Sequence, residues 1–260
     1  MASVASNRLE QPLPSKLAKE PLLEAVCQLN VGSSVELQNL LPGVMFSQFP
    51  SEVSAIEPLP AMQLPAELRG LDQAIAEAWL LRFQWRGFSV LVSPHQVAVT
   101  TPIPYPGWNS YKSAIATLFK TVLTLPVVNS VERLSVKYTN LIEGGAPEDR
   151  VSQLDFDLRI GGLNLSRKSI FVRAESELDG CANILEIAGD VTVQVARPQM
   201  TKNGLLVAVD TIQKDASNFP CSLFVEDLDR KLDAIRLTNK KVFFSSLTAE
   251  SIKSMGPTYE

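Results

Sequence analysis

The clearest alternation of apolar and polar positions lies near the end of the chain, in residues Asp227–Phe244. A helix built from these residues collects four apolar side chains on one side, Leu228, Leu232, Ile235 and Val242. Most of the charged residues of the segment fall elsewhere on the helix. This spacing is typical of an amphipathic helix that packs one stripe on a sheet. The segment just before it, Gly204–Gln213, predicts a strand.

The N-terminal half alternates between strand and helix patterns. Apolar and β-branched residues predict strands at Glu24–Val31, Trp79–Val92, Gln96–Thr101 and Val131–Ile142. Helical spacing predicts a short helix over Val35–Leu41, which ends at Pro42-Gly43, and a second helix from Asn109 or Ser110 to about Val122. The order β-α-β-β-α-β predicts a ferredoxin-like sheet that is covered by helices on one face.

Two stretches of this half carry no regular pattern. Residues 1–20 are rich in polar residues and contain Pro12 and Pro14, so they predict a flexible arm. Prolines at positions 50, 58, 60 and 65 predict an extended connection over Phe46–Ala66. Residues Glu67–Ala78 fit either a short helix or a continuation of that connection, so the secondary structure of residues 46–78 stays open.

The C-terminal half begins after Gly144–Ser152, whose Gly, Pro and charged residues are typical of a linker. Four strands are expected after it, at Gln153–Ile160, Ser169–Glu177, Asn183–Ala196 and Gly204–Gln213. The turns between them are expected at Gly161-Gly162, Leu178-Asp179-Gly180 and Lys202-Asn203-Gly204. An antiparallel meander closed by the long helix follows, and Thr248 is expected to cap a short last helix that runs to about Met255.

Together these patterns predict an α+β fold of two sheet-and-helix halves. The expected domain organisation is an N-terminal arm over residues 1–20, a ferredoxin-like domain over 21–143, and a sheet-and-helix domain over 153–260. The change of composition at 144–152 sets the boundary between the two domains.

Composition and charge exclude several classes of protein. The 260 residues are 45% apolar and 20% charged, which suits a packed core rather than a disordered chain. The formal net charge of −4 gives no support to general polyanion binding, although a local basic patch stays open. No apolar run reaches the roughly 20 residues of a membrane-spanning helix, and residues 1–15 lack the apolar region of a secretory signal. Three distant cysteines, Cys27, Cys181 and Cys221, suit a reducing compartment, so a cytoplasmic protein is expected.

Three segments resemble a known family. They are Pro21–Leu29 (PLLEAVCQL), Val131–Ile142 (VERLSVKYTNLI) and Asn239–Thr248 (NKKVFFSSLT). In this order they are similar to a sporadically distributed family of uncharacterised bacterial proteins of about this length. Members carry an "APIVEA"-like opening, an "LRYxNxI"-like middle and a "KNxxFFxSLT"-like close. Lys137 stands where the family has Arg. The resemblance implies no activity or cofactor, and the scattered occurrence of the family suggests mobile or defence-associated genes.

His95 is the only histidine and the one candidate for a general base. It follows Pro94 at the tip of a predicted hairpin, where a solvated turn residue is the simpler interpretation. Phosphate-binding glycine motifs, GxSxG and HExxH are absent from the sequence. The sequence therefore leans against an enzyme without deciding the question, and it predicts no cofactor.

Carboxylates at strand spacing are the candidates for a metal site. Asp155 and Asp157 share one face of a predicted strand, as do Glu175 and Glu177. Asp210 lies on the apolar side of another strand, where burial would require a partner. An exposed sheet face is the favoured explanation of the paired acids, and a structural role is the favoured explanation of Asp210, so no metal is expected.

An RNA-binding surface is the alternative that a ferredoxin-like half suggests. Arg133 and Lys137 share one face of a predicted strand, Arg82 and Arg86 are candidates to extend that face, and Trp85 lies near them in the sequence. Tyr138 alternates with the basic residues and should point the other way. Asn140 shares the face of Tyr138, and we expect it to pin a neighbouring loop through hydrogen bonds.

Tyr105 and Trp108 lie on the proline-rich bend Pro102–Trp108 and are candidate anchors of a protein interface, or a cover over the end of the first core. The sequence thus favours a non-enzymatic interaction or accessory protein, of the kind found in a bacterial defence or mobile-element system. The expected partner is another protein, encoded nearby or a second copy of the chain. The alternative is an RNA-binding protein or a metal-independent ribonuclease with His95 as base.

Overall fold

The computed structural model describes residues 12–146, 149–164, 170–196, 199–214 and 219–259. It has a mixed α+β fold with a large antiparallel sheet, which confirms the α+β class predicted from the sequence. The chain divides into two compact units. Unit 1 comprises Met1–Leu23, Lys137–Thr211 and Ile235–Glu260, and unit 2 comprises Glu24–Val136 and Ile212–Ala234. The predicted linker, residues 144–152, lies inside unit 1, so the two units do not coincide with the two predicted domains.

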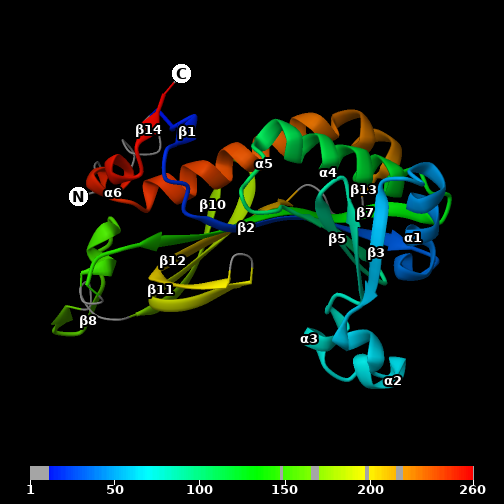
Figure 1. Cartoon of the computed structure of the whole chain (residues 1–260), viewed down its shortest axis with the longest axis horizontal. Coiled ribbons are helices and arrows are strands. Elements are labelled where there is room, and N and C mark those ends of the chain that lie inside the picture. Colours follow the sequence, from blue (N-terminus) through cyan, green and yellow to red (C-terminus); the bar gives the residue numbers. More distant parts are fainter. Residues whose placement is uncertain (1–11, 147–148, 165–169, 197–198, 215–218, 260) are drawn as a thin grey trace. The chain divides into compact units, whose positions relative to one another are not determined.

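Unit 2 is a sheet with helices packed on it (Figure 1). Its neighbouring strands, in order, are β7 (Val128–Glu143), β2 (Leu22–Ser33), β6 (Gln96–Thr100), β5 (Phe88–Ser93), β4 (Leu81–Trp85) and β3 (Val53–Pro58). The two-residue strand β13 (Phe219–Pro220) pairs with β7. The helices are α1 (Leu37–Gln48), α4 (Trp108–Leu123) and residues 221–234 of α5 (Cys221–Ser245). β7 and β2, like α5, continue into unit 1.

The core of unit 2 follows from the alternation in β2. Its odd-numbered side chains from Ala25 to Val31 are fully buried, whereas its even-numbered ones are half-buried. Helix α4 adds its apolar stripe, and the buried ring of Tyr111 ends with its hydroxyl 2.7 Å from the Val99 carbonyl oxygen. That hydrogen bond satisfies the polar end of a large buried ring, so α4 is held against the sheet by both burial and a specific contact.

Helix α1 corrects the prediction that Pro42-Gly43 ends the first helix. The helix runs on through Pro42 to Gln48. A proline inside a helix loses one backbone hydrogen bond. Leu37, Leu41 and Met45 are fully buried on one side of the helix, and their burial outweighs that loss.

Two further predictions in this half are wrong. Residues 79–92 form two strands, β4 and β5, because Arg86 and Gly87 have positive φ and close a two-residue hairpin turn between them. The stretch 46–66 is not an irregular connection, since it contains β3, which pairs with β4, and the 3₁₀ helix η1 (Pro60–Gln63). Residues 67–78, left open by the sequence, lie in short helices, α2 (Ala66–Arg69) and α3 (Gln73–Ala76), and the turns around them.

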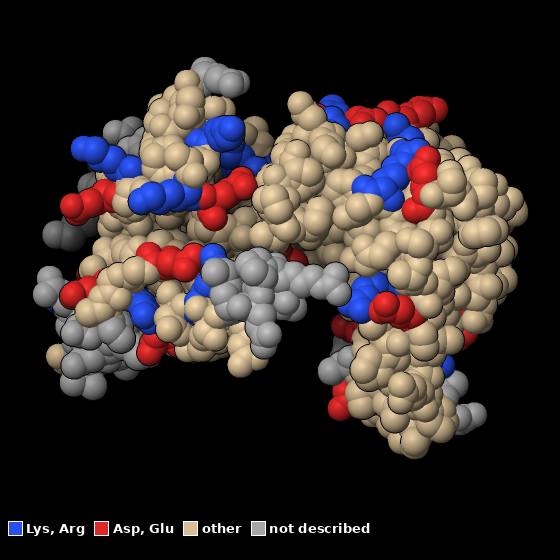
Figure 2. Space-filling view, viewed as in Figure 1, with Lys and Arg blue, Asp and Glu red and all other residues tan. Residues whose placement is uncertain are grey.

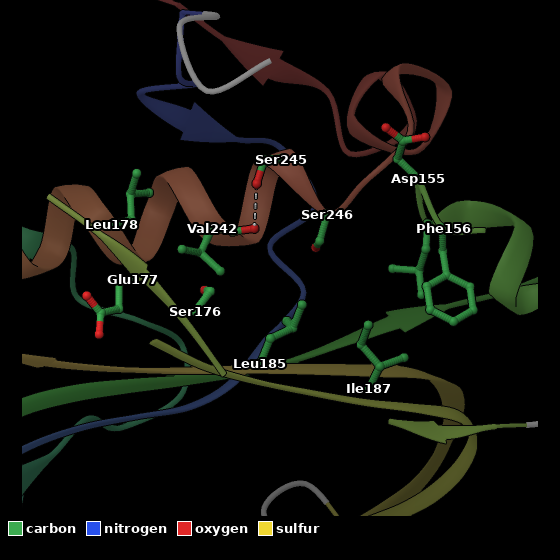
Figure 3. A pocket seen from close by; sticks show the side chains of 11 residues that line it. Asp155, Phe156, Ser176, Glu177, Leu178, Leu185, Ile187, Val242, Ser245 and Ser246 are labelled. Carbon is green, nitrogen blue, oxygen red and sulfur yellow. Dashed lines mark hydrogen bonds between the residues drawn. The ribbon is translucent and has the colours of Figure 1, made fainter. Parts of the chain in front are cut away.

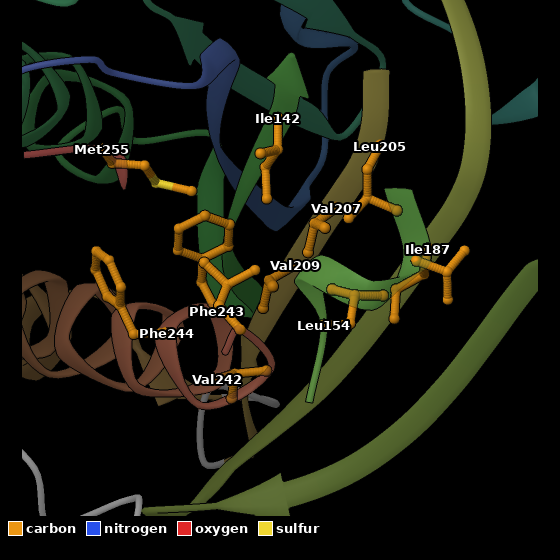
Figure 4. Packing of buried hydrophobic residues seen from close by; sticks show 12 residues of the cluster. Ile142, Leu154, Ile187, Leu205, Val207, Val209, Val242, Phe243, Phe244 and Met255 are labelled. Atoms are coloured by element: carbon orange, nitrogen blue, oxygen red, sulfur yellow. The ribbon is translucent and has the colours of Figure 1, made fainter. Parts of the chain in front are cut away.

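Unit 1 is built around β10 (Phe171–Leu178), β11 (Cys181–Ala196), β12 (Gln199–Gln213) and the second part of β7, which are neighbours in this order. Residues 235–245 of α5 and helix α6 (Ala249–Ser254) pack on it. Smaller elements complete the unit: η2 (Arg150–Gln153), the hairpin of β8 (Arg159–Ile160) and β9 (Leu163–Asn164), and the pair β1 (Lys16–Leu17) and β14 (Pro257–Thr258). Figure 4 shows Ile142, Val207 and Val209 of the strands facing Val242 and Phe243 of the helix.

The structure corrects three predictions in unit 1. The predicted strand 153–160 is mostly η2 and irregular chain, so only Arg159–Ile160 is a strand. Asn203-Gly204 is no turn, because β12 runs straight through it. The described part of the N-terminal arm is not loose, since Ala18 and Lys19 donate backbone hydrogen bonds to Gly256 and Met255. In contrast, the Asp179-Gly180 turn and the capping of α6 by Thr248, whose hydroxyl accepts from Ser251 N at 3.2 Å, are confirmed.

A chain of hydrogen bonds crosses the interior of unit 1. Asn239 of α5 donates to the Val209 carbonyl oxygen at 2.8 Å and to the Thr211 hydroxyl at 3.1 Å. Thr211 in turn donates to the Asn183 side-chain oxygen at 2.8 Å. All three side chains are buried, so α5, β12 and β11 are joined by polar contacts that exclude water.

Lys240 attaches the N-terminal segment to α5. Its ammonium group donates to the carbonyl oxygen of buried Pro14 at 2.6 Å. Burial, together with the nearby charge of Arg236, lowers the pKa of Lys240 to about 8. Because this value is below that of an unfolded lysine, the folded state binds fewer protons between about pH 8 and 10.5. Its stability therefore rises with pH across that window.

We expect Lys240 to be acylated at a lower pH than an ordinary lysine. Acylation requires the neutral amine, and a pKa of about 8 gives half-neutral Lys240 near pH 8, whereas ordinary lysines titrate near pH 10.4. The protein is treated with a limiting amount of an acetylating reagent at a series of pH values. Peptide mass spectrometry then gives the pH at which acetylation of Lys240 is half-maximal. The same series in urea is the control. An identical Lys240 midpoint in the folded and the unfolded protein would contradict this expectation.

Candidate interaction surface

His95 lies in the turn between β5 and β6, and its side chain is exposed. The hydrogen bond of this residue that the structure records uses its backbone carbonyl, which accepts from Val31 N at 2.9 Å. Among the residues that the structure describes, no nucleophile forms a hydrogen bond with the His95 side chain. The position suits a hairpin turn rather than a general base, which must be held within hydrogen-bond reach of the proton it takes.

The candidate metal ligands are not assembled into a site. Asp155 and Asp157 are exposed on irregular chain after η2, where Asp157 lies 3.5 Å from Arg159, and the strand face that was to align them does not form. Asp210 is half-buried in β12, and Glu175 pairs with Arg173 at 2.6 Å. Within the described ranges, no group of three or more His, Cys, Asp or Glu side chains has the arrangement of a metal site.

The basic residues of the predicted RNA face are spread out, and several of them pair with acids. Arg82 of β4 lies 2.6 Å from Glu57, and Lys137 lies 2.9 Å from Glu186. In unit 2 the strands β5, β6 and β2 lie between Arg82 on β4 and half-buried Arg133 on β7. With about 4.8 Å from each strand to the next, the two residues are about 19 Å apart. Figure 2 shows the same mixing, with Lys and Arg beside Asp and Glu on the visible face.

The central strands of unit 2 also lack the aromatic platform of an RNA-binding sheet. The half-buried face of β2 carries Val26, Gln28 and Asn30, and the Gln28 amide donates to Asn30 and to Gln96. Tyr138 is buried under the guanidinium of Arg236, which lies 4.7 Å from the ring centroid. Asn140 bonds the Val207 carbonyl of β12 at 3.4 Å, so it contacts a strand and not the expected loop.

Tyr105 and Trp108 are half-buried at the start of α4. Both rings pack edge-on against Tyr111, and the Trp108 indole N–H donates to Asp233 at 2.9 Å. Burial would raise the pKa of Asp233, but hydrogen bonds from Lys112 and Trp108 outweigh it and hold the pKa below its usual value. These aromatic residues thus cover the end of the core and join α4 to α5, which leaves only part of each ring open to a partner.

The most exposed apolar segment is one that the sequence left unassigned. Residues 56–71, here called the apolar arm, run from β3 through η1 and α2. Five of their large apolar side chains are exposed, from 38% for Met62 to 80% for Leu71; the others are Ile56, Leu64 and Leu68. Large exposed apolar groups gathered in one segment mark an interaction site more often than single ones do.

The apolar arm projects from the β3–β4 edge of the unit 2 sheet. Figure 1 shows α2 and α3 beyond the ends of these strands, and Figure 2 shows mostly uncharged surface there. The charged groups around it are of both signs: Asp72 and Glu77 are exposed, half-buried Arg69 ends α2, and Glu57 is paired with Arg82. The signal in the sequence was three prolines with interspersed Leu, Ile and Met. It was missed because such spacing has neither the helical nor the strand period.

No family model matches the chain, and the curated proteins contain no match to it. No helix in the described part of the chain is both long enough and apolar enough to cross a membrane.

Proposed function

We propose that this chain is a non-enzymatic interaction protein that binds a second protein through the apolar arm. The observation that carries the proposal is the exposure of Ile56, Met62, Leu64, Leu68 and Leu71 within one projecting segment. Apolar side chains that become buried at an interface contribute to binding through the hydrophobic effect. The scattered placement of His95, the acids and the basic residues supports a role without catalysis.

The partner that fits the arm is a different protein with an apolar groove. Such a groove would cover the exposed side chains of Leu64, Leu68 and Leu71. The resemblance to a sporadic bacterial family adds the proposal that the partner is encoded nearby, in a defence or mobile-element system.

The test compares two triple variants. In the arm variant Leu64, Leu68 and Leu71 become Ser; in the control Val35, Leu223 and Leu237, which are exposed elsewhere, become Ser. The partner recovered under mild conditions from the source cells is purified and titrated against each variant. We expect the arm variant to bind at least about 100-fold more weakly, because three anchors are lost, and the control to bind like the wild type. Equal binding by both variants would refute the proposal, as would a partner that proves to be a second copy of the chain.

The finer description of unit 2, a ferredoxin-like core, also stays a proposal. It is supported by the neighbour order β7, β2, β6, β5, with α1 after β2 and α4 before β7. On this view the pair β3–β4 is an addition at one edge. This order is the one observation that favours the RNA-binding or ribonuclease alternative. Cleavage of structured RNA that disappears in His95→Ala would support that alternative, and no cleavage by either protein would remove it.

A further inference from the structure

The sheet of unit 1 ends at β10, which pairs with β11 and with no other strand in the described part of the chain. Six of the eight side chains of β10 are exposed and the other two are half-buried, so no other element covers the strand. An uncovered edge strand presents a row of backbone N–H and C=O groups that can pair with a further strand. β10 is therefore a candidate for pairing between chains.

The hydrogen-bond pattern of the β10–β11 pair determines which backbone groups face the open edge. Gly189 N donates to the Ile170 carbonyl oxygen at 2.8 Å, and the register continues without a shift along the whole of β10. Opposite residues of an antiparallel pair alternate between hydrogen-bonded and non-hydrogen-bonded positions. The even-numbered residues of β10 therefore direct their N–H and C=O groups to β11. The odd-numbered residues direct theirs to the open edge, and they include Phe171, Arg173 and Glu175.

β10 lacks the features that usually keep a strand edge from pairing. It contains no proline, and its register with β11 has no bulge. The side chains that it directs toward the core and α5 are uncharged, and they are Val172, Ala174, Ser176 and Leu178. The edge strand of unit 2 has the opposite character, because the register of β3 with β4 shifts between Ser54 and Glu57 and β3 ends in Pro58. Bulges and prolines protect a strand edge, so β3 is protected and β10 is open.

We propose that two copies of this chain pair antiparallel through their β10 strands, so that the sheet of unit 1 continues from one copy into the other. The two-fold axis would pass at Ala174, with Arg173 of each copy opposite Glu175 of the second copy. An axis at residue 173 or 175 would instead place two arginines or two glutamates opposite each other, and like charges directly opposite destabilise a strand pair. Arg173 lies 2.6 Å from Glu175 of its own strand, and this contact can remain, because charge serves only to choose the register.

The same register is apolar on the side of α5. It places Leu178 opposite Ile170 of the second copy, Ser176 opposite Val172 of the second copy, and the small Ala174 opposite its equivalent. Leu178 and Ser176 line a pocket of about 330 Å³ between β10, β11 and the end of α5 (Figure 3). Ile170 and Val172 are half-buried and pack on the core of unit 1, so pairing would extend this core across the axis. Burial of these side chains would add to the main-chain hydrogen bonds of the new strand pair.

The first test measures association of the full-length protein by sedimentation velocity over a concentration series. We expect a reversible dimer, which Arg173→Glu weakens about tenfold or more by creating two pairs of like charges across the axis. Adding Glu175→Arg to this variant restores opposite charges in the same register and should return the affinity to within about threefold of the wild type. Glu175→Arg alone should weaken the dimer as Arg173→Glu does, and it replaces that variant if the protein does not fold.

Two controls separate this interface from other surfaces. Arg159→Glu makes the same charge change at an exposed position of unit 1 outside β10, and it should dimerise like the wild type. The arm variant should also dimerise like the wild type, because the apolar arm lies in unit 2. Pairing through β10 would therefore be additional to the binding of another protein by the arm, and either proposal can fail without the other.

Hydrogen exchange followed by NMR tests whether β10 itself is the interface. In the monomer the amides of Arg173 and Glu175 should exchange faster than those of Val172 and Ala174, which bond to β11. Raising the protein concentration should slow exchange at Arg173 and Glu175 and leave Val172 and Ala174 unchanged. A wild type that stays monomeric up to about 1 mM would overturn the proposal. So would a dimer in which exchange at Arg173 and Glu175 does not slow, or a charge swap that does not restore the affinity.

Discussion

Replacing Gly204 by alanine is expected to lower the free energy of unfolding by about 3 kcal/mol or more. Gly204 lies inside β12, beside the second part of β7. A Cβ atom there would lie 2.5 Å from the Ile142 carbonyl oxygen and 3.0 Å from Leu141 Cγ. The first of these atoms is backbone, so the clash can be relieved only by moving one strand away from the other, which weakens the core packed on both.

The matched control is Gly43→Ala in α1. Gly43 is exposed, and a Cβ there would meet nothing within 4 Å. Alanine at an exposed helical position should stabilise the protein, by about 0.5–1 kcal/mol. Urea unfolding of the two variants measures both values. A Gly204→Ala protein as stable as the wild type would show that β12 and β7 do not approach as closely as described.

Asn239→Ala is expected to cost about 2–3 kcal/mol of stability, although alanine is the better helix former. The substitution removes two hydrogen bonds and leaves the Val209 carbonyl and the Thr211 hydroxyl without them in a buried place. It also leaves a small cavity between α5 and β12. The loss should appear as a lower urea midpoint with little change in the slope of the transition.

A double-mutant cycle separates this network from simple loss of packing. Thr211→Val removes the hydroxyl between Asn239 and Asn183 and keeps the shape of the side chain. We expect the double variant to lose clearly less than the sum of the two single losses, because both substitutions break one chain of bonds. Leu237→Ala, at an exposed position of the same helix, should change stability by less than about 0.5 kcal/mol. Strictly additive losses would mean that the network is not coupled.

The elements predicted correctly are those in which one physical signal dominates. Leu228, Leu232 and Ile235 recur at helical spacing, and all three are buried in α5, which starts six residues before the predicted helix. Ala25 and Cys27 alternate with half-buried residues, as a strand with one buried face requires. In both cases the local period and the tertiary packing agree, so the local sequence is sufficient to predict the helix or strand.

The predictions that are wrong share a different cause, which is a local signal overridden by contacts far away in the sequence. Asn203-Gly204 has the composition of a hairpin turn, yet Gly204 is used for its small size beside Ile142. Pro42 has the composition of a helix stop, yet it lies within a helix held by buried Leu41 and Met45. The local sequence pattern predicts neither the strand through Gly204 nor the helix through Pro42. Each depends on packing against residues that are distant in the sequence and adjacent only in the folded protein.

The candidate surfaces were harder to find for the same reason. The apolar arm is recognised by the exposure of Leu68 and Leu71, and exposure is a property of the folded protein.

Helix α5 has a consequence for any attempt to dissect this protein. Residues 221–234 belong to one compact unit and residues 235–245 to the other, within a single uninterrupted helix. A truncation after residue 143 would therefore deprive unit 2 of Ile212–Ala234 and unit 1 of the strands β10, β11 and β12. Neither fragment would contain a complete hydrophobic core. The phenotype of such a deletion would therefore reflect the loss of both units and not the role of either one.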